Sequence, residues 1–213
     1  HATFHLKYIA GKYGMDDLGG LKILFRFACD QSPLQTTHPK ELGYISAWAS
    51  NGAGLELSYH AREGERPWYK VLRVRIVGKG LKEGDEINLI LGDKSKGSPG
   101  MRLQTFCEPF FEFRTMVDAF STNVFIPVPS PKISLISGPP YQWRAYLPTV
   151  IYEKEVFSLK FRAEDKWGNP TDKANLKIFF KSTHPIKGLP RSYHVKEGNF
   201  GHIIEGLQLD KDL

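Results

Sequence analysis

Apolar and polar residues alternate with a period of two along most of this chain. In the clearest example, Leu72, Val74 and Ile76 alternate with Arg73 and Arg75. Successive side chains of a strand point to opposite faces, so this pattern predicts strands with one buried face and one solvated face. The pattern recurs at residues 21–27, 86–91, 111–117, 157–163, 176–180 and 203–209. Because no convincing long segment has a helical period, the alternation predicts an all-β chain of antiparallel sheets.

Turn-forming residues divide these strands into many short segments. The 20 glycines and 14 prolines are spread through the chain, which favours sheet over helix. We predict further strands at Thr3–Ile9, Tyr44–Ala49, Gly54–His60, Arg102–Phe106 and Asn123–Val128. About nine or ten strands in residues 1–128 predict an antiparallel β-sandwich domain of the jelly-roll type.

A proline-rich stretch separates this domain from a second one. Residues 129–140 read PSPKISLISGPP, which predicts a semi-rigid connector with at most a short strand. Residues 141–213 then show strands at regular spacing, which predicts an immunoglobulin-like β-sandwich. The core prediction is specific: the residues expected to be buried are Phe25, Phe27, Leu72, Val74, Ile76, Leu89, Phe113, Leu159, Phe161, Leu176 and Ile178.

The charge pattern and the hydropathy of the chain limit the kinds of partner that it is expected to bind. The net charge is +6, but the chain has no basic run that would follow a phosphate backbone, so we expect no nucleic-acid partner. No segment approaches the about 18 apolar residues of a membrane span and no signal peptide is visible, so we expect a soluble chain without a membrane partner. The compartment stays open. Because the chain begins at His1 and stops soon after a strand-like segment, we expect a piece of a longer polypeptide.

Motifs of catalytic and metal sites are absent from the sequence. It contains no G-x-S-x-G, P-loop, H-E-x-x-H or C-x-x-C motif, and its seven histidines are isolated. We therefore expect no catalytic residue, no metal site and no cofactor in this chain, and no enzymatic activity of its own. Cys29 and Cys107 are interpreted as buried free thiols. A nucleophilic role for Cys107 would need a neighbouring base and a positive environment.

The loop Gly92–Arg102, which begins GDKSKGSPG, is the first candidate contact site. Lys94, Ser98 and Arg102 could hold an anion or a carboxylate beside closely approaching backbone amides. The alternative is an ordinary hairpin loop in which Arg102 pairs with Glu108 or Asp93.

Aromatic residues make the second candidate. Trp68 and Tyr69, beside Arg66, could stack against a sugar ring or a base, and with Trp48 they could make a carbohydrate platform, whereas the alternative is that Trp68 covers the end of the core. Tyr141 and Trp143 are further candidates for sugar stacking. The segment Ala163–Pro170 is interpreted as a tight turn formed by the Asp165 carboxylate, because a calcium site of Asp165, Asn169 and Asp172 would need more oxygens.

Several segments resemble a known family: LKILFRFACD, RPWYKVLRVRI, FSLKFRAEDKWGNP and, most specifically, the run from Gly92 to Phe120. They are similar to the N-terminal β region of a large, mostly bacterial family that carries a domain of unknown function. Its members continue into a C-terminal domain similar to PHP-type, amidohydrolase-like metallohydrolases, opened by a W-G-D-L-H-like motif. This chain differs at Cys29, where a serine-like residue is expected, and it ends before any such motif.

The resemblance implies a function. It implies a non-catalytic accessory region of an uncharacterised metal-dependent hydrolase, which packs on the C-terminal catalytic domain of the same polypeptide or shapes its site. It also implies that a divalent metal binds only in that absent domain. The alternative is a β-sandwich module that binds a carbohydrate or another ligand, so a small anionic molecule or a sugar is a possible partner.

Overall fold

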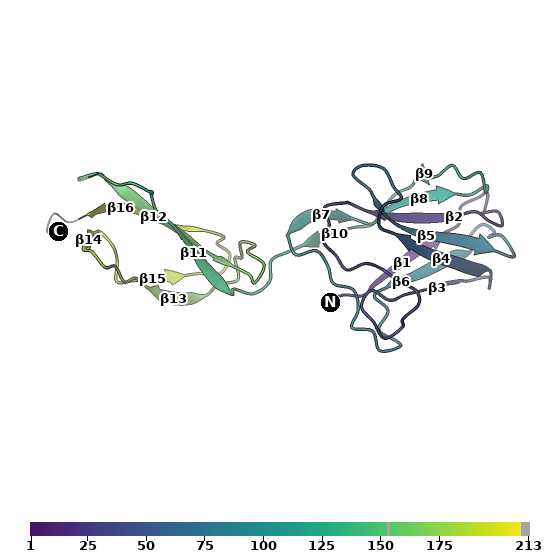
Figure 1. The fold of residues 1–213 in the computed structure, drawn as a ribbon, viewed down its shortest axis with the longest axis horizontal. Helices are drawn as coiled ribbons and strands as arrows, with labels where there is room; N and C mark the ends of the chain where they lie inside the picture. Colours follow the sequence, from purple (N-terminus) through teal and green to yellow (C-terminus); the bar gives the residue numbers. More distant parts are fainter. Residues whose placement is uncertain (153, 210–213) are drawn as a thin grey trace. The chain divides into compact units, whose positions relative to one another are not determined.

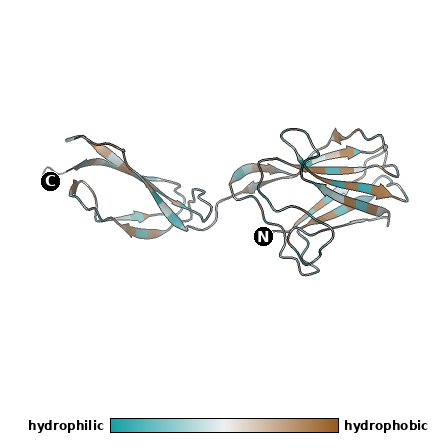
Figure 2. Ribbon diagram, in the orientation of Figure 1, coloured by the Kyte–Doolittle hydropathy of each residue, from teal (hydrophilic) through white to brown (hydrophobic). Residues whose placement is uncertain are grey.

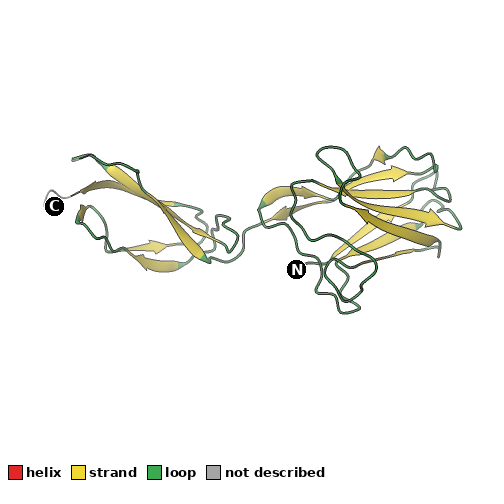
Figure 3. Ribbon diagram, in the orientation of Figure 1, coloured by secondary structure: helices red, strands yellow, loops and turns green. Residues whose placement is uncertain are grey.

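The computed structural model describes residues 1–152 and 154–209, and every regular element in that part of the chain is a strand (Figure 3). The prediction of an all-β chain is therefore confirmed. The strands are β1 Phe4–Ile9, β2 Gly20–Phe25, β3 Ile45–Ala49, β4 Gly54–His60, β5 Lys70–Val77, β6 Glu86–Leu91, β7 Glu108–Glu112, β8 Arg114–Asp118, β9 Ile126–Pro127, β10 Lys132–Leu135, β11 Gln142–Tyr146, β12 Phe157–Glu164, β13 Leu176–Phe179, β14 Ile186–Lys187, β15 Ser192–Val195 and β16 His202–Leu209.

The chain divides into two compact units. Unit 1 comprises His1–Thr105 and Pro109–Ser134, and unit 2 comprises Phe106–Glu108 and Leu135–Leu213. The predicted ranges differ from these in two ways. The segment Phe106–Glu108 belongs to unit 2 although unit 1 flanks it on both sides, and the unit boundary lies between Ser134 and Leu135, so the predicted connector 129–140 is divided between the units. The short strand allowed in that connector is β10, which pairs with β7.

Unit 1 contains two larger antiparallel sheets. One has five strands in the order β4-β5-β2-β8-β9, and the other has three in the order β1-β6-β3 (Figure 1). β2 lies in the middle of the first sheet, where Leu21 is opposite both Val74 and Val117. Because residues directly opposite each other share a face, these three side chains make one row on the buried side.

The core of unit 1 forms where alternate side chains face inward. Phe4 of β1 packs against Phe113 with ring centroids 5.0 Å apart, and Phe113 packs edge-on against Phe25 of β2 at 6.0 Å. Hydrophobic and hydrophilic bands alternate along the strands of this unit, as the strand period requires (Figure 2). Phe25, Leu72, Val74, Ile76, Leu89 and Phe113 are buried as predicted.

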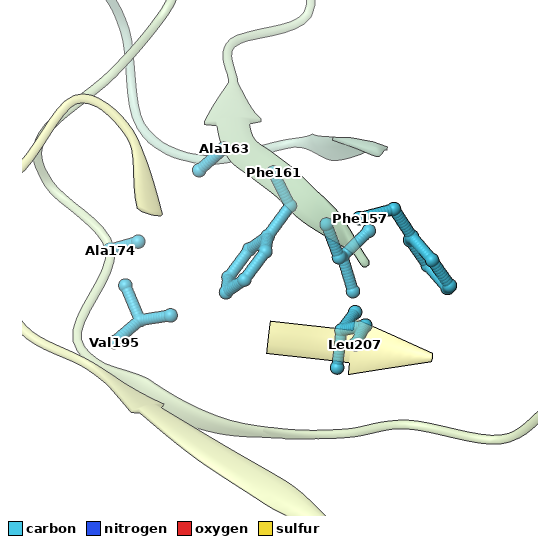
Figure 4. Packing of buried hydrophobic residues seen from close by; sticks show 7 residues of the cluster. Phe157, Phe161, Ala163, Ala174, Val195 and Leu207 are labelled. Atoms are coloured by element: carbon cyan, nitrogen blue, oxygen red, sulfur yellow. The ribbon is translucent and has the colours of Figure 1, made fainter. Parts of the chain in front are cut away.

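Unit 2 has a smaller core between its four-stranded sheet, β11-β12-β16-β14, and its two-stranded sheet, β13-β15. β12 supplies most of it, because its alternate residues Phe157, Leu159, Phe161 and Ala163 are all buried. Figure 4 shows Phe161 projecting from β12 toward the side where Ala174 and Val195 lie. The predicted burial of Leu159 and Phe161 is confirmed.

Two burial predictions are wrong and one is only partly met. Phe27 is 51% exposed, because β2 ends at Phe25 and the period of two does not continue past it. Leu176 is 41% exposed, since it begins β13 at the end of a two-stranded ladder. Ile178 is partly buried and packs against the core of unit 2.

Some predicted strands also differ from those observed. Arg102–Phe106 is not a strand, because Asp30 accepts hydrogen bonds from the Thr105 backbone at 2.8 Å and hydroxyl at 2.9 Å and holds the segment as a loop. Of the predicted strand 123–128 only β9 forms, since residues 119–123 after β8 make a turn and a bend instead. The single predicted strand through residues 111–117 is interrupted at Phe113, where pairing changes from β10 to β2.

Candidate functional site

The outer face of the five-stranded sheet of unit 1 carries a concentration of charge. On β5 the buried residues Leu72, Val74 and Ile76 alternate with outward Arg73 and Arg75. The register places Arg73 directly between Lys22 of β2 and Ser58 of β4. The next row along the strands places Arg75 between Gly20 and Glu56. The strands β4, β5 and β2 are neighbours in this sheet (Figure 1), so the register places these groups on one face.

This surface is hollowed into a cleft of about 510 Å³. The lining residues are Leu18, Gly19, Gly20, Glu56, Leu57, Ser58, Arg73, Val74, Arg75, Asp118, Ser121, Asn123 and Phe125. Gly19 and Gly20 lack side chains at the centre of the lining, and a Cβ on Gly20 would meet the Val74 carbonyl oxygen at 2.1 Å. The close approach of β2 and β5 thus requires glycine here, and that glycine leaves space above the sheet.

The loop that follows β8 supplies one wall of the cleft, and Asp118 holds it in place. The Thr122 and Asn123 amides donate to the Asp118 carboxylate at 3.0 and 2.6 Å, and the Thr122 hydroxyl donates at 3.1 Å. Burial opposes the charged form, but these hydrogen bonds outweigh it and hold the pKa of Asp118 below its ordinary value. The fixed loop, with positive φ at Ser121 and Asn123, brings Phe125 to the cleft.

Lys22 and Arg73 lie directly opposite each other on this face. Two positive charges in this position would be unfavourable without a neighbouring negative charge. Glu63, from the loop between β4 and β5, provides it: its carboxylate lies 3.4 Å from Lys22 Nζ and also accepts a hydrogen bond from Arg73 Nη2. His60 Nε2 is 3.5 Å from the same carboxylate. Burial opposes the charge of Glu63, but Arg73 and Lys22 together lower its pKa.

Other polar groups of the cleft are not used within the chain. Arg73 Nε is buried and has no hydrogen-bond partner among the described residues. Within the same part of the chain, neither the Arg75 nor the Glu56 side chain makes a hydrogen bond or an ion pair within standard distances, although the two residues are cross-strand neighbours. Phe125 contributes an apolar ring, whose centroid lies 4.3 Å from Lys22 Nζ. The cleft therefore offers donors, an acceptor and an aromatic surface together.

Trp68 lies further along the same face and is surrounded by arginines. The guanidinium carbons of Arg26 and Arg114 are 5.4 and 5.3 Å from the centroid of its ring. Arg66 lies 5.7 Å from the ring of Phe27, next to the cis Arg66–Pro67 bond. Both predicted residues, Arg66 and Trp68, are thus in an aromatic and cationic cluster, and Trp68 is partly exposed rather than enclosed in the core.

The predicted site at Gly92–Arg102 is a compact loop with its own internal bonds. Ser98 is buried, and its hydroxyl donates to the Glu41 carbonyl at 2.7 Å and accepts from the Gly100 amide at 3.1 Å. The Ser95 amide donates to Asp93, and the Gly97 amide donates to the Lys94 carbonyl. The amides on which the anion-site prediction depends are therefore occupied within the loop, whereas the Lys94 side chain is exposed.

Arg102 lies within an ion pair inside unit 1, which was the alternative to a ligand clamp. Its Nη1 is 3.4 Å from Asp30 Oδ2, and Nη2 donates to the Asp30 carbonyl. Asp93, one of the partners expected for Arg102, instead accepts from the Ser46 hydroxyl at 2.5 Å. A contact of Lys94, Ser98 or Arg102 with a ligand stays a prediction.

The predicted aromatic residues lie on different elements. Trp48 lies on β3 in the three-stranded sheet, where its ring is 5.8 Å from that of His5. Trp68 lies beside the five-stranded sheet instead, and Tyr69 packs with Phe27 at 6.1 Å. Trp48 is thus part of a strand, whereas Trp68 lies in the loop between β4 and β5, and sugar stacking by these residues stays a prediction.

The predicted burial of Cys107 is wrong, whereas Cys29 is buried as expected and both thiols are free. Cys107 is exposed because its segment crosses to unit 2, where the Cys107 amide donates to Asn169 Oδ1 at 3.1 Å. Partial burial and the nearby Asp165 raise the pKa of the Cys107 thiol. A raised pKa is the opposite of what activates a cysteine nucleophile.

The turn formed by Asp165 in unit 2 is confirmed. The Trp167 and Asn169 amides donate to Asp165 Oδ1 at 2.9 and 3.0 Å, and Gly168 has a φ of +85°. The Gly138 amide donates to Oδ2 at 3.0 Å, so both carboxylate oxygens are used. Over the described residues there is no group of three or more His, Cys, Asp or Glu side chains placed to hold a metal ion.

The cleft residues were missed because their proximity depends on strand pairing. The alternation of Arg73 and Arg75 was visible as a solvated face, but nothing local connects these residues with Gly20, Glu63 or Phe125. One usable signal was the spacing of two arginines on the polar face of a strand, which places both on one side of the sheet.

Within the part of the chain that is described, no helix has the length and hydropathy needed to span a membrane.

Comparisons with protein-family models, with curated proteins and with solved structures find no match to this chain. The resemblance stated above therefore stays a prediction, and the geometry of unit 1 is the basis for a functional proposal.

Proposed function

We propose that this chain is a ligand-binding β module, and that unit 1 binds a hydroxyl-rich ligand such as a sugar in the cleft above Gly20. The observation that carries this proposal is the set of unused polar groups around the cleft: Arg75, Glu56 and the buried Nε of Arg73. Arg75 and Glu56 are exposed, so the guanidinium of one can donate to ligand hydroxyls and the carboxylate of the other can accept from them.

The chemistry of the lining favours a carbohydrate over a purely apolar ligand. Arginine donates, a carboxylate accepts, and the Ser58 and Asn123 side chains can do both. Sugar hydroxyls need donors and acceptors together, while the apolar face of a sugar ring packs on an aromatic ring such as that of Phe125.

The test is a binding titration of the purified chain against a panel of oligosaccharides. We expect Arg75→Ala and Phe125→Ala each to weaken binding about tenfold, which corresponds to about 1.4 kcal/mol. Lys82→Ala is the matched control, since Lys82 is an exposed cation of unit 1 outside the cleft, and it should bind like the parent chain. The proposal fails if no oligosaccharide binds, or if the cleft variants and Lys82→Ala behave alike.

A second candidate function is the accessory role in a metal-dependent hydrolase, and unit 2 supplies the observation for it. Between residues 141 and 156 many large apolar side chains are exposed, with Tyr141 and Tyr152 at 75% and Val150 at 64%. Concentrations of exposed apolar side chains are typical of surfaces that bind another protein or domain. In this proposal the segment packs on the catalytic domain of the same polypeptide.

The accessory role is tested by the coding sequence that follows Leu213. A histidine-containing D-L-H motif within the next several tens of codons would support it, and a stop codon there would refute it. In the longer protein, Tyr141→Ser with Tyr152→Ser should detach the downstream domain, measured as a larger radius of gyration in small-angle X-ray scattering.

A further inference from the structure

We propose that the ligand of the outer face of unit 1 is an acidic oligosaccharide, whose carboxylates or sulfates lie along a row of cations from Arg75 to Arg114. This inference rests on the proposed function and names its ligand class. It depends on three observations: the charge balance of the face, the position of Glu63, and the extension of the cationic surface to Trp68.

The outer face has more cations than carboxylates available to a ligand. Four cations, Lys22, Arg73, Arg75 and Arg114, share this face with the carboxylates of Glu56, Glu63 and Asp118. Asp118 is buried and its carboxylate accepts hydrogen bonds from its own loop, so it offers little charge to a ligand. Glu63 is paired with Lys22 and Arg73. Of these three carboxylates, Glu56 is the one that makes no hydrogen bond or ion pair with the described residues.

Glu63 shows that this face can hold a carboxylate. It is not a neighbour of Lys22 or Arg73 in the sheet, but the loop between β4 and β5 brings it over both cations. Its lowered pKa shows that the cations stabilise the negative charge there. A carboxylate or sulfate of a ligand would experience the same attraction, and Glu63 would compete with it for Lys22 and Arg73.

The cations are arranged in successive rows, which suits an extended ligand. Arg75 lies in the row of Gly20, Arg73 in the row of Lys22, and Arg114 in the row of Leu24. Residues two apart on a strand are about 7 Å apart, so these rows cover about 14 Å along the sheet. At the far end, Trp68 lies against Arg26 and Arg114 and adds an aromatic surface.

An acidic sugar fits these features better than a nucleic acid. Glu56 lies across from Arg75 in the cleft and would repel a continuous phosphate backbone, but it can accept hydrogen bonds from sugar hydroxyls. A uronic acid or a sulfated sugar carries both anionic groups and hydroxyls. The anionic groups would pair with the cations of the face, and the hydroxyls would donate to Glu56.

The first experiment compares polymers that carry anionic groups with uncharged polymers of the same sugar backbone. Calorimetric titration would measure polygalacturonate against its fully methyl-esterified form, and dextran sulfate against dextran. We expect the charged member of at least one pair to bind at least tenfold more tightly, with affinity falling as sodium chloride rises. Arg75→Gln and Arg114→Gln should each reduce this preference, whereas Lys82→Gln should not. The two pairs distinguish carboxylate from sulfate as the anionic group.

The second experiment removes the internal competitor. Glu63→Gln should increase the affinity for the charged polymer by up to about fivefold, since a partly exposed ion pair such as that of Glu63 and Lys22 is worth about 0.2–1 kcal/mol. Affinity for the neutral partner should not change. Glu65→Gln is the matched control, because Glu65 is an exposed glutamate of the same loop that does not pair with Lys22 or Arg73.

The outcomes separate this inference from the function on which it rests. Equal binding of the charged and neutral polymers would overturn the acidic ligand but support a sugar-binding cleft. Binding of neither polymer, nor of any other sugar, would overturn both. Tighter binding of a single-stranded oligonucleotide than of either charged polymer would overturn the acidic sugar as ligand. Weaker binding by Glu63→Gln, with an unchanged unfolding temperature, would contradict the role assigned to Glu63.

Discussion

At the scale of single residues, buried carboxylates of this protein stabilise turns. Asp165 is 3% exposed, yet it is surrounded by amides of its own turn and by the Gly138 amide. Burial opposes its charge, but the hydrogen bonds from Gly138 and Asn169 outweigh that cost, and the pKa of Asp165 lies below its ordinary value. The sequence predicted this turn because all but one of its bonds are local.

We predict that Asp165→Ala destabilises unit 2 by about 1–3 kcal/mol at neutral pH, because the amides lose their acceptor. A group with a lowered pKa in the folded state stabilises it above the unfolded pKa and loses that effect as pH falls. The difference between parent and variant should therefore shrink below about pH 3.9. Urea unfolding at several pH values measures it. Asp172→Ala, in the same region, serves as control, and a difference that does not change with pH would contradict the assignment.

Phe113 provides a test of the core of unit 1. It is 1% exposed and contacts the rings of Phe4, Phe25 and Phe111. We expect Phe113→Ala to lower the free energy of unfolding by about 3–5 kcal/mol, since it empties a buried aromatic site. Phe110→Ala, at a ring that is 68% exposed, should change it by about 0.5 kcal/mol or less. A loss below about 1 kcal/mol at Phe113 would mean that its site is not a packed core position.

At the scale of elements, local alternation located most strands of unit 1, but it did not give their partners. Gly54–His60 was predicted with the bounds of β4, since the alternation is clear and turns flank it. The interruption at Phe113 could not be predicted, because residues 111–117 alternate without a break while the pairing partner changes. The cleft could not be predicted for the same reason. It forms because β4, β5 and β2 are neighbours in the sheet, and no local sequence pattern indicates which strands pair.

Gly20 tests the contact between the two central strands. A Cβ there would lie 2.1 Å from the Val74 carbonyl oxygen, whereas a Cβ at Gly11 would meet nothing within 4 Å. We expect Gly20→Ala to cost about 1–3 kcal/mol, because backbone must move to accept it. Gly11→Ala should be close to neutral. Thermal unfolding measures both, and equal unfolding temperatures for the two variants would contradict the close approach of β2 and β5.

At the scale of the whole molecule, each unit has its own buried cluster. The core of unit 2 consists of Phe157, Leu159, Phe161, Ala163, Ala174, Val195 and Leu207, all from residues after the connector. The prediction of two domains came from composition, since the proline-rich stretch 129–140 separates two sets of alternating segments. The finer division could not be predicted, because the assignment of residues 106–108 depends on contacts with residues far along the chain.

Two separate cores predict two responses to mutation. Phe113→Ala should increase hydrogen exchange mainly in peptides of unit 1, and Phe161→Ala mainly in peptides of unit 2, because each ring packs within its own unit. Hydrogen–deuterium exchange with mass spectrometry resolves the two sets of peptides. If either variant increased exchange equally in both units, the chain would unfold as one cooperative body.

The segment Phe106–Glu108 has a consequence for how the protein is made. The Cys107 amide bonds to Asn169, which the ribosome adds 62 residues later. At about 5–20 residues per second, several seconds pass between the synthesis of the two groups. During that interval the rest of unit 1 can emerge from the ribosome and fold. Residues 106–108 lack their contacts in this period, because the rest of unit 2 has not yet been synthesised. Until Asn169 has been added and unit 2 has folded, the nascent protein therefore carries Phe106 and Cys107 without the hydrogen bond from the Cys107 amide to Asn169 that ties them to unit 2.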